Sequence, residues 1–186
     1  MTLEYGTPEY GTPEYGSHYN IIDTWTESTT GWTATATASV TTDPTHYVGT
    51  VCVRATIPNS VQKIRLTFAS PLDTTGTDRL CMWLRTFAKS GNYQYLRCHT
   101  NTSNYYEITT PFINTSTGVW TLNGWRKGSF TPVGLLPRWE SIAYIEFQIQ
   151  GNLPYYAYGM DGLGFYDGQP SLGTIHYGTP HFDPSP

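Results

Sequence analysis

Charged residues are scarce in this sequence. Asp, Glu, Lys and Arg make up 13% of its 186 residues, against about a quarter in an ordinary soluble domain. The net charge is −4, and the ten Lys and Arg residues are scattered along the chain. A nucleic-acid-binding protein needs a concentrated basic surface. The composition therefore predicts that nucleic acid is not a partner.

Long apolar runs are also missing. No stretch approaches the roughly 18–20 apolar residues that a helix needs to span a bilayer, so we expect no membrane partner. The first residues, MTLEYGTPEYG, have neither the basic start nor the apolar run of a signal peptide. We therefore expect the protein to be made in the cytoplasm.

The sequence shows no recognisable catalytic motif. The three cysteines, Cys52, Cys81 and Cys98, lack Cys-x-x-Cys spacing and are expected to be reduced, buried thiols. Gly-x-Ser-x-Gly, His-Glu-x-x-His and Walker sequences are absent. A glycosidase needs two facing carboxylates, but the acids between residues 20 and 167 are isolated from one another in the sequence. We expect no enzymatic activity.

Apolar and polar residues alternate through most of residues 20–167. Clear examples are VCVRATI at 51–57, RLCMWLRTF at 79–87 and SIAYIEFQI at 141–149. This period of two is typical of half-buried strands, and turn sequences rich in Gly, Pro, Asn and Asp separate the runs. No segment has the apolar spacing of a helix. The pattern predicts an all-β, antiparallel jelly-roll β-sandwich.

Two segments flank this region, residues 1–19 and 168–186, and both are rich in Pro, Gly, Thr and Tyr. The sequence YGTP occurs in both, at Tyr5 to Pro8, Tyr10 to Pro13 and Tyr177 to Pro180, and Tyr15 begins a further, incomplete unit. A proline in every unit disfavours helix and sheet interior, so we expect two extended arms. The arms are either simple spacers or assembly devices whose tyrosines enter pockets on a neighbouring copy.

Aromatic side chains make up 15% of the sequence. We expect Tyr105, Tyr106, Trp120 and Trp125 to form a platform on which sugar rings stack. Core packing or subunit contacts are alternative roles for the same side chains. A second surface is expected if the strands carrying Trp83 and Tyr95 pair, since Tyr93, Tyr95 and Arg97 share one face and Trp83, Arg85 and Phe87 share another.

Segments near both ends of residues 20–167 carry a likeness to a known family. The early segment contains Trp25 and Gly31-Trp32, and the late segment reads YGMDGLGF from Tyr158. These features resemble the galactose-binding-like jelly rolls, which include many carbohydrate-binding modules and modules of phage virion proteins. The resemblance implies a structural calcium held by Asp161, with Asp23 or Glu27 as partner. A role of Asp161 in capping a turn is the alternative, because Gly162 stands where a second acid is often found.

These observations favour a non-enzymatic structural protein of a phage or virus virion. We expect a capsid decoration protein or a tail-associated protein, assembled in the host cytoplasm, whose arms contact other virion proteins and copies of itself. The alternative function is a carbohydrate- or receptor-binding module that uses the aromatic platform, with glycans as partners.

Overall fold

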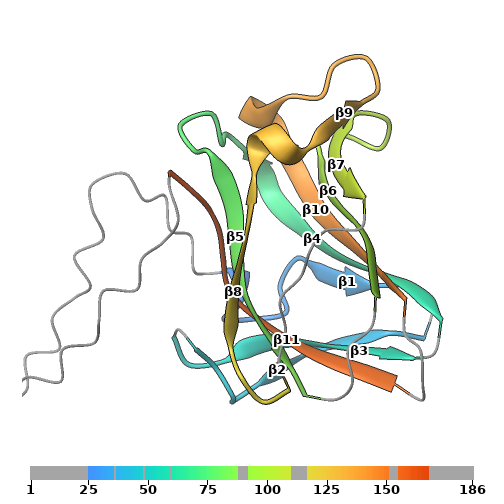
Figure 1. Cartoon of the computed structure of the whole chain (residues 1–186), viewed down its shortest axis with the longest axis vertical. Helices are drawn as coiled ribbons and strands as arrows, with labels where there is room; N and C mark the ends of the chain where they lie inside the picture. Colours follow the sequence, from blue (N-terminus) through green and yellow to red (C-terminus); the bar gives the residue numbers. More distant parts are fainter. Residues whose placement is uncertain are drawn as a thin grey trace, which may run out of the picture.

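A computed structural model shows the chain as a two-layer β-sandwich (Figure 1). It describes residues 25–35, 37–47, 49–58, 60–87, 92–109, 117–150 and 155–167. The predicted all-β jelly-roll sandwich is confirmed. The predicted arms, residues 1–19 and 168–186, lie outside the described residues, as do Asp23 and the repeated Tyr and Pro positions named above.

Sheet A contains six strands in the spatial order β1-β4-β10-β6-β7-β9. Their bounds are β1 Trp32–Ala34, β4 Val61–Leu72, β10 Ile142–Gln150, β6 Asn92–His99, β7 Tyr105–Thr109 and β9 Thr131–Val133. Neighbouring strands pair antiparallel throughout this order.

Sheet B contains five strands in the order β2-β3-β11-β5-β8, again paired antiparallel. Their bounds are β2 Ser39–Asp43, β3 Cys52–Pro58, β11 Tyr155–Tyr166, β5 Arg79–Thr86 and β8 Thr121–Arg126. Two short 3₁₀ turns, η2 Lys127–Ser129 and η3 Trp139–Ser141, precede β9 and β10. Within the described residues, neither helix has the length and apolar character needed to cross a membrane.

The space between the two sheets is filled by apolar side chains from both. Ile145 and Phe147 of β10 are fully buried, as are Met82 and Leu84 of β5. Successive side chains of a strand point to opposite faces. The residues between these core positions therefore lie on the outer faces of the sandwich.

Strand β11 contains an irregularity where it pairs with β5. The register shifts between Asp161 and Gly164, and Gly162 has a φ of 52°. Residues other than glycine adopt this backbone conformation at a cost, so Gly162 suits the bulge. The bulge lies beside the buried carboxylate of Asp161, which takes part in the contacts described below.

Candidate functional site

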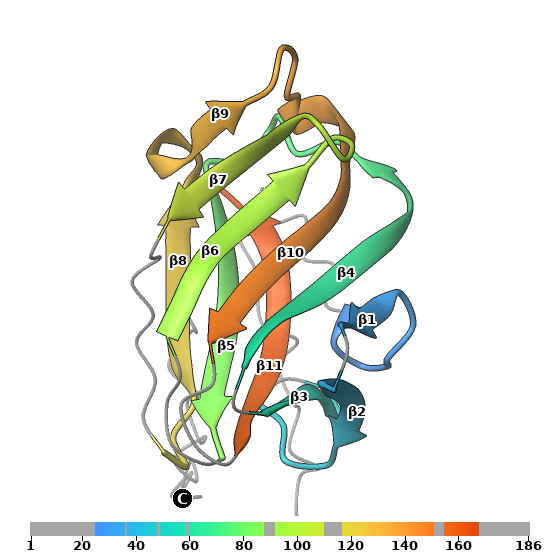
Figure 2. The same ribbon diagram turned by 90° about the vertical axis from the view of Figure 1, so that its right-hand side faces the viewer.

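Figure 2 shows β4, β10, β6 and β7 side by side in sheet A. The strand register gives an aromatic row of Thr67, Tyr144, His99 and Tyr105, a charged row of Arg65, Glu146, Arg97 and Glu107, and a third row of Lys63, Gln148, Tyr95 and Thr109. Residues directly opposite one another on the same face of a sheet are in contact distance. Each row can therefore act as a connected unit.

The aromatic row is a continuous stack of rings. The His99 ring lies parallel to that of Tyr144, with centroids 4.2 Å apart and an interplanar angle of 14°. The Tyr105 ring, on the neighbouring strand β7, packs on the side of His99 away from Tyr144, and its centroid lies 4.6 Å from that of His99. The guanidinium of Arg65 sits over the Tyr144 ring at 4.3 Å. Tyr144 and His99 are buried, at 8% and 4% exposed, so the accessible parts of the row are the half-buried Tyr105 ring and the cation of Arg65.

Glu146 is the centre of the charged row. Its side chain is only 2% exposed, yet both oxygens have partners. Oε2 accepts hydrogen bonds from Arg65 Nε at 3.1 Å and Nη2 at 2.6 Å, and Oε1 accepts one from the Tyr95 hydroxyl at 2.9 Å. Lys63 Nζ lies 3.4 Å from Oε1. The carboxylate therefore fixes three neighbouring side chains on the outer face.

These contacts keep Glu146 ionised. Burial alone would raise the pKa of Glu146, but the hydrogen bonds from Arg65 and Tyr95 and the charge of Lys63 outweigh it and lower the pKa. Hydrogen bonds and cations favour the charged form of a carboxyl group. Glu146 is consequently a fixed anion at neutral pH.

Arg97 holds the other half of the charged row in place. Its Nε donates to Glu107 on β7, and its guanidinium lies 3.7 Å from the centroid of the Tyr95 ring and 4.6 Å from that of Tyr105. An arginine packed between two aromatic rings and paired with a carboxylate has few alternative positions. The face therefore presents cations in a fixed arrangement above tyrosine rings.

The environment of His99 determines the protonation state of its ring. Its Nδ1 lies 3.1 Å from the carbonyl oxygen of Asn101, which assigns the N–H to Nδ1. The other ring nitrogen, Nε2, is buried without a hydrogen-bond partner among the described residues. Burial lowers the pKa of His99 below its usual 6.5. The ring is therefore neutral at neutral pH.

We expect the free energy of unfolding to decrease as the pH falls below about 6.5. Below that pH, His99 binds a proton in the unfolded chain but stays neutral in the folded protein, so acid favours unfolding. The effect ends when the pH falls below the lower pKa that His99 has in the folded state. The slope contributed by one proton is at most about 1.4 kcal/mol per pH unit. Denaturant titrations from pH 7.5 to 5 measure it. His99→Phe is expected to reduce the dependence of the free energy of unfolding on pH, and His46→Gln, a change at an exposed histidine, is the control. An unchanged pH dependence in His99→Phe contradicts the prediction.

The four residues of the predicted sugar platform do not lie on one surface. Tyr105 belongs to the aromatic row on sheet A. Tyr106, the next residue, points inward, stacks on Trp139 at 4.0 Å and donates to the carbonyl oxygen of Pro137. Trp125 is part of the hydrophobic core, and Trp120 packs over Gly159 of sheet B. Strand alternation separates neighbours such as Tyr105 and Tyr106, so the platform of the sequence prediction is not assembled.

The second expected surface is also divided. It required the strands carrying Trp83 and Tyr95 to pair, but β5 belongs to sheet B and β6 to sheet A. The chain crosses between the sheets after β5, so Tyr95 and Arg97 lie on one outer face while Trp83 and Arg85 lie on the other. The alternation pattern correctly predicted which side chains of each strand face outward, but it did not predict which strands pair with each other.

The calcium prediction is only partly addressed by the described residues. Asp161 is fully buried, and its oxygens accept hydrogen bonds from Thr26 Oγ1 at 3.1 Å, Tyr47 N at 2.6 Å and Gly162 N at 2.8 Å. Donors of this kind suit a carboxylate that caps the backbone, which was the alternative role. Glu27 fits a cation better, because its Oε1 is buried without a hydrogen-bond partner in the described part of the chain.

A calcium ion takes six to eight oxygen ligands. Among the described residues no group of three or more His, Cys, Asp or Glu side chains is placed to hold a metal ion, and Asp23 lies outside those residues. Calcium at Asp161 and Asp23 therefore stays a prediction.

No family model and no curated protein matches the sequence. The structure is similar to the family 11 carbohydrate-binding module of a cellulosomal cellulase of Clostridium thermocellum, with a TM-score of 0.54 at 10% identity, over 76% of this chain and 89% of that chain. A family 11 module of C. thermocellum in complex with a β-1,3-1,4-mixed-linked tetrasaccharide has the same TM-score and identity, over 74% and 88% of the two chains.

Part of a larger enzyme is also similar. A structure of the glycoside hydrolase domain of Endo-D from Streptococcus pneumoniae has a TM-score of 0.51 at 16% identity, over 75% of this chain and 22% of that chain. At such low identities these likenesses show a shared β-sandwich fold. Function has to be argued from the residues of the site.

Proposed function

We propose that the protein is a non-catalytic carbohydrate-binding β-sandwich that holds an oligosaccharide on the outer face of sheet A. The observation that carries the proposal is the charged row lying beside the aromatic row on one face. Sugar-binding sites commonly combine flat aromatic surfaces, which pack against C–H groups, with a few fixed polar groups that bind hydroxyls.

The cations of this face are suited to bind hydroxyl groups. The Arg65 and Lys63 side chains are 40% and 42% exposed, while the Glu146 carboxylate that fixes them is buried underneath. Each cation therefore meets solvent from a position already set by its partner. Binding to such preorganised groups costs less conformational entropy than binding to mobile side chains.

The neighbouring structures support this class of ligand. The C. thermocellum module described above is seen with a β-1,3-1,4-mixed-linked tetrasaccharide, and its fold spans most of the present chain. The sequence alternative of a carbohydrate-binding module is thereby favoured over the virion role. A virion role stays a prediction, because the arms on which it depends lie outside the described residues.

Binding is proposed in preference to hydrolysis because of the state of Glu146. The general acid of a glycosidase needs a raised pKa to carry a proton at neutral pH. The pKa of Glu146 is lowered instead, and Glu107 on the same face is paired with Arg97. Both carboxylates are therefore built to orient cations.

We expect the purified chain to bind a glycan and Tyr144→Ala to weaken that binding at least tenfold. The buried tyrosine ring supports both His99 and Arg65, so its loss frees the cation that would contact the glycan. A tenfold change corresponds to about 1.4 kcal/mol. Immobilised β-1,3-1,4-glucan and a glycan array are the first probes, with calorimetry on any hit.

Thr41→Ala, an exposed change on β2 of sheet B, is the matched control and is expected to bind as the natural chain does. Two results would overturn the proposal. One is an array with no hit, and the other is a glycan whose affinity is the same for Tyr144→Ala and the natural chain.

A further inference from the structure

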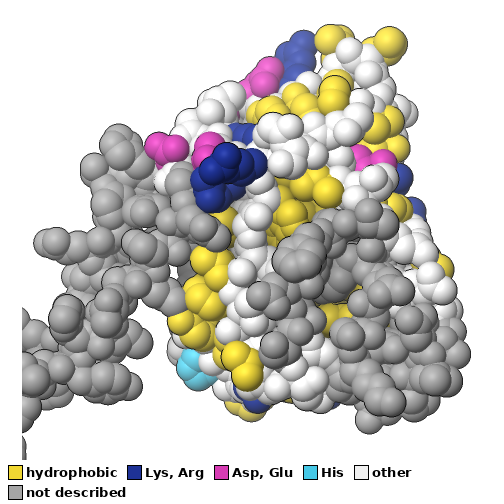
Figure 3. All heavy atoms as spheres, viewed as in Figure 1, with side chains coloured by type: hydrophobic (Ala, Val, Ile, Leu, Met, Phe, Trp, Pro, Cys, Tyr) yellow, Lys and Arg dark blue, Asp and Glu magenta, His cyan; other side chains and the backbone are white. Residues whose placement is uncertain are grey.

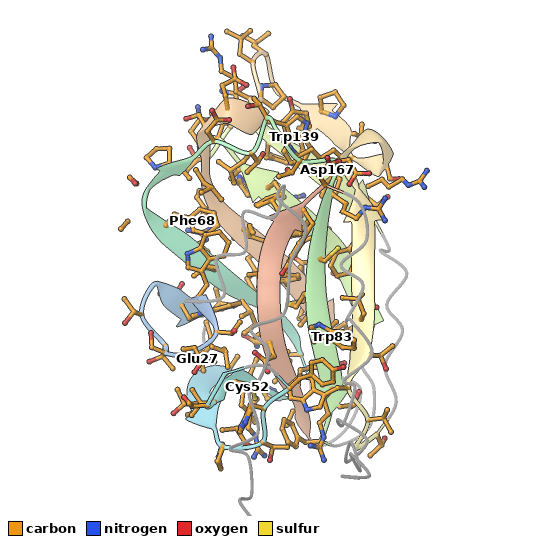
Figure 4. The ribbon with its side chains drawn as sticks, turned by 90° about the vertical axis from the view of Figure 1, so that its left-hand side faces the viewer. Glu27, Cys52, Phe68, Trp83, Trp139 and Asp167 are labelled. Atoms are coloured by element: carbon orange, nitrogen blue, oxygen red, sulfur yellow. The ribbon has the colours of Figure 1, made fainter. Side chains whose placement is uncertain are left out.

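The outer face of sheet B carries a second group of aromatic side chains. The Tyr47 ring is stacked on Trp83 at 4.0 Å and lies 6.4 Å from Trp120. Trp120 and Phe87 close over Gly159 of β11, where an added Cβ would lie 2.7 Å from Trp120 Cη2 and 3.0 Å from Phe87 Cε2. Figure 4 shows Trp83 on this side of the sandwich, and Figure 3 shows apolar side chains along the edge where Figure 1 places β8.

Two hydrogen-bond donors in this group have no acceptor among the described residues. Within the part of the chain that the structure describes, Arg85, which lies opposite Gly159 in the strand register, has a buried Nε without a partner, and Trp120 has a buried Nε1 without one. Arg85 also makes no ion pair within the described ranges, whereas Arg54 is paired with Asp43. A buried donor left unpaired costs about 1–3 kcal/mol. An occupant of this face would therefore need to supply both a carbonyl acceptor and an anion.

We propose that this face, formed around Trp83, Arg85 and Trp120, is a docking surface for the repeat EYGTPEYGTPEYG at residues 4–16 of the same chain. Proline-rich extended segments are commonly recognised by aromatic surfaces on which prolines and tyrosines pack. An indole N–H then donates to a backbone carbonyl of the segment. The repeat offers such carbonyls together with a glutamate in every unit.

Among the segments outside the described residues, the N-terminal one contains the most acidic residues, which could pair with Arg85. Residues 1–24 contain Glu4, Glu9, Glu14 and Asp23 and no Lys or Arg. The internal segments 88–91, 110–116 and 151–154 contain no acid, and residues 168–186 contain Asp183 alone. The repeat is therefore the segment best able to neutralise Arg85.

The described chain starts close to this face. Thr26 donates to Asp161 of β11, which pairs with Trp83 and lies two residues from Gly159. Two residues of a strand span about 7 Å. Residues 17–24 can extend roughly 26–29 Å, which is enough for the repeat to turn back. Figure 4 places Glu27 and Trp83 below Asp167, where the described chain ends, so the N-terminal segment starts nearer to this face.

The test compares the full chain with a full-length variant carrying Tyr5→Ala, Tyr10→Ala and Tyr15→Ala. The readout is the indole N–H signal of Trp120 in a nitrogen–proton NMR spectrum, assigned through Trp120→Phe. We expect the signal to shift in the triple variant and to exchange with water at least tenfold faster. The indole signals of Trp125 and Trp139 should not move. Added peptide EYGTPEYGTPEYG should restore the original Trp120 signal.

Tyr19→Ala, a tyrosine of the same segment outside the repeat, is the matched control. An unchanged Trp120 signal in the triple variant overturns the proposal. A shift that depends on protein concentration also overturns it, because the occupant would then be the repeat of a second copy. If a glycan, but not the peptide, restores the signal, the face is a sugar site instead. Since the readout lies on sheet B, it is independent of binding at Tyr144.

Discussion

Glu146→Gln is expected to weaken glycan binding at least tenfold and to lower the free energy of unfolding by about 1–3 kcal/mol. The carboxylate holds Arg65, Lys63 and the Tyr95 hydroxyl together beneath the outer face of sheet A. Glutamine has a similar shape but lacks the charge, and its amide nitrogen cannot accept a hydrogen bond. Hydrogen bonds to charged groups contribute about 1.5–3 kcal/mol. The freed cations would then have to be ordered again by the ligand.

Calorimetric titration and chemical denaturation measure the two effects separately. Glu140→Gln is the matched control, because that carboxylate is 51% exposed in η3 and its ion pair with Arg138 is long, at 4.0 Å. We expect it to change neither quantity beyond experimental error. If Glu146→Gln binds glycan as tightly as the natural chain, the charged row is a structural ion-pair network and does not orient a ligand.

Strand alternation predicts which way each residue faces, and it succeeds locally. Met82 and Leu84 of β5 point into the core as the alternation requires, and Trp83 and Arg85 point outward. It cannot predict which strands become neighbours, because pairing joins segments that are far apart in sequence. Strand β6 pairs with β10, about fifty residues later, instead of with β5. The expected surface that combined Trp83 with Tyr95 failed for that reason.

The sequence prediction grouped aromatic residues and did not find the site on sheet A. Its charged row takes Arg65, Arg97, Glu107 and Glu146 from four strands, and in the sequence each acid looks isolated. A usable signal was present within single strands. Tyr144 and Glu146 occupy the outward positions of β10, and an acid at an outward position of a central strand needs a cation from a neighbouring strand. Which arginine supplies it depends on the register.

Asp161→Ala is expected to lower the free energy of unfolding by about 2–6 kcal/mol. The carboxylate is fully buried and accepts hydrogen bonds from Thr26, Tyr47 and Gly162, which belong to three different segments. Alanine would leave the buried Thr26 hydroxyl and the part-buried Tyr47 N without this acceptor, each costing about 1–3 kcal/mol, while Gly162 N keeps Thr26 Oγ1 at 3.2 Å. It would also loosen the Tyr47 ring from Trp83. Denaturant unfolding gives the free energy, and the tryptophan fluorescence of the folded state reports the stack.

Asp161→Asn separates the shape of this side chain from its charge. We expect a smaller loss, because an amide oxygen in the place of Oδ1 still accepts from Thr26 and Gly162 while the amide nitrogen faces the N–H of Tyr47. Repeating both titrations in excess calcium and in chelator tests the predicted ion. A midpoint that rises with calcium in the natural chain, but not in Asp161→Ala, supports a metal beside Asp161. Equal midpoints in the natural chain argue that the hydrogen bonds alone hold Thr26 and Tyr47 to the bulge of β11.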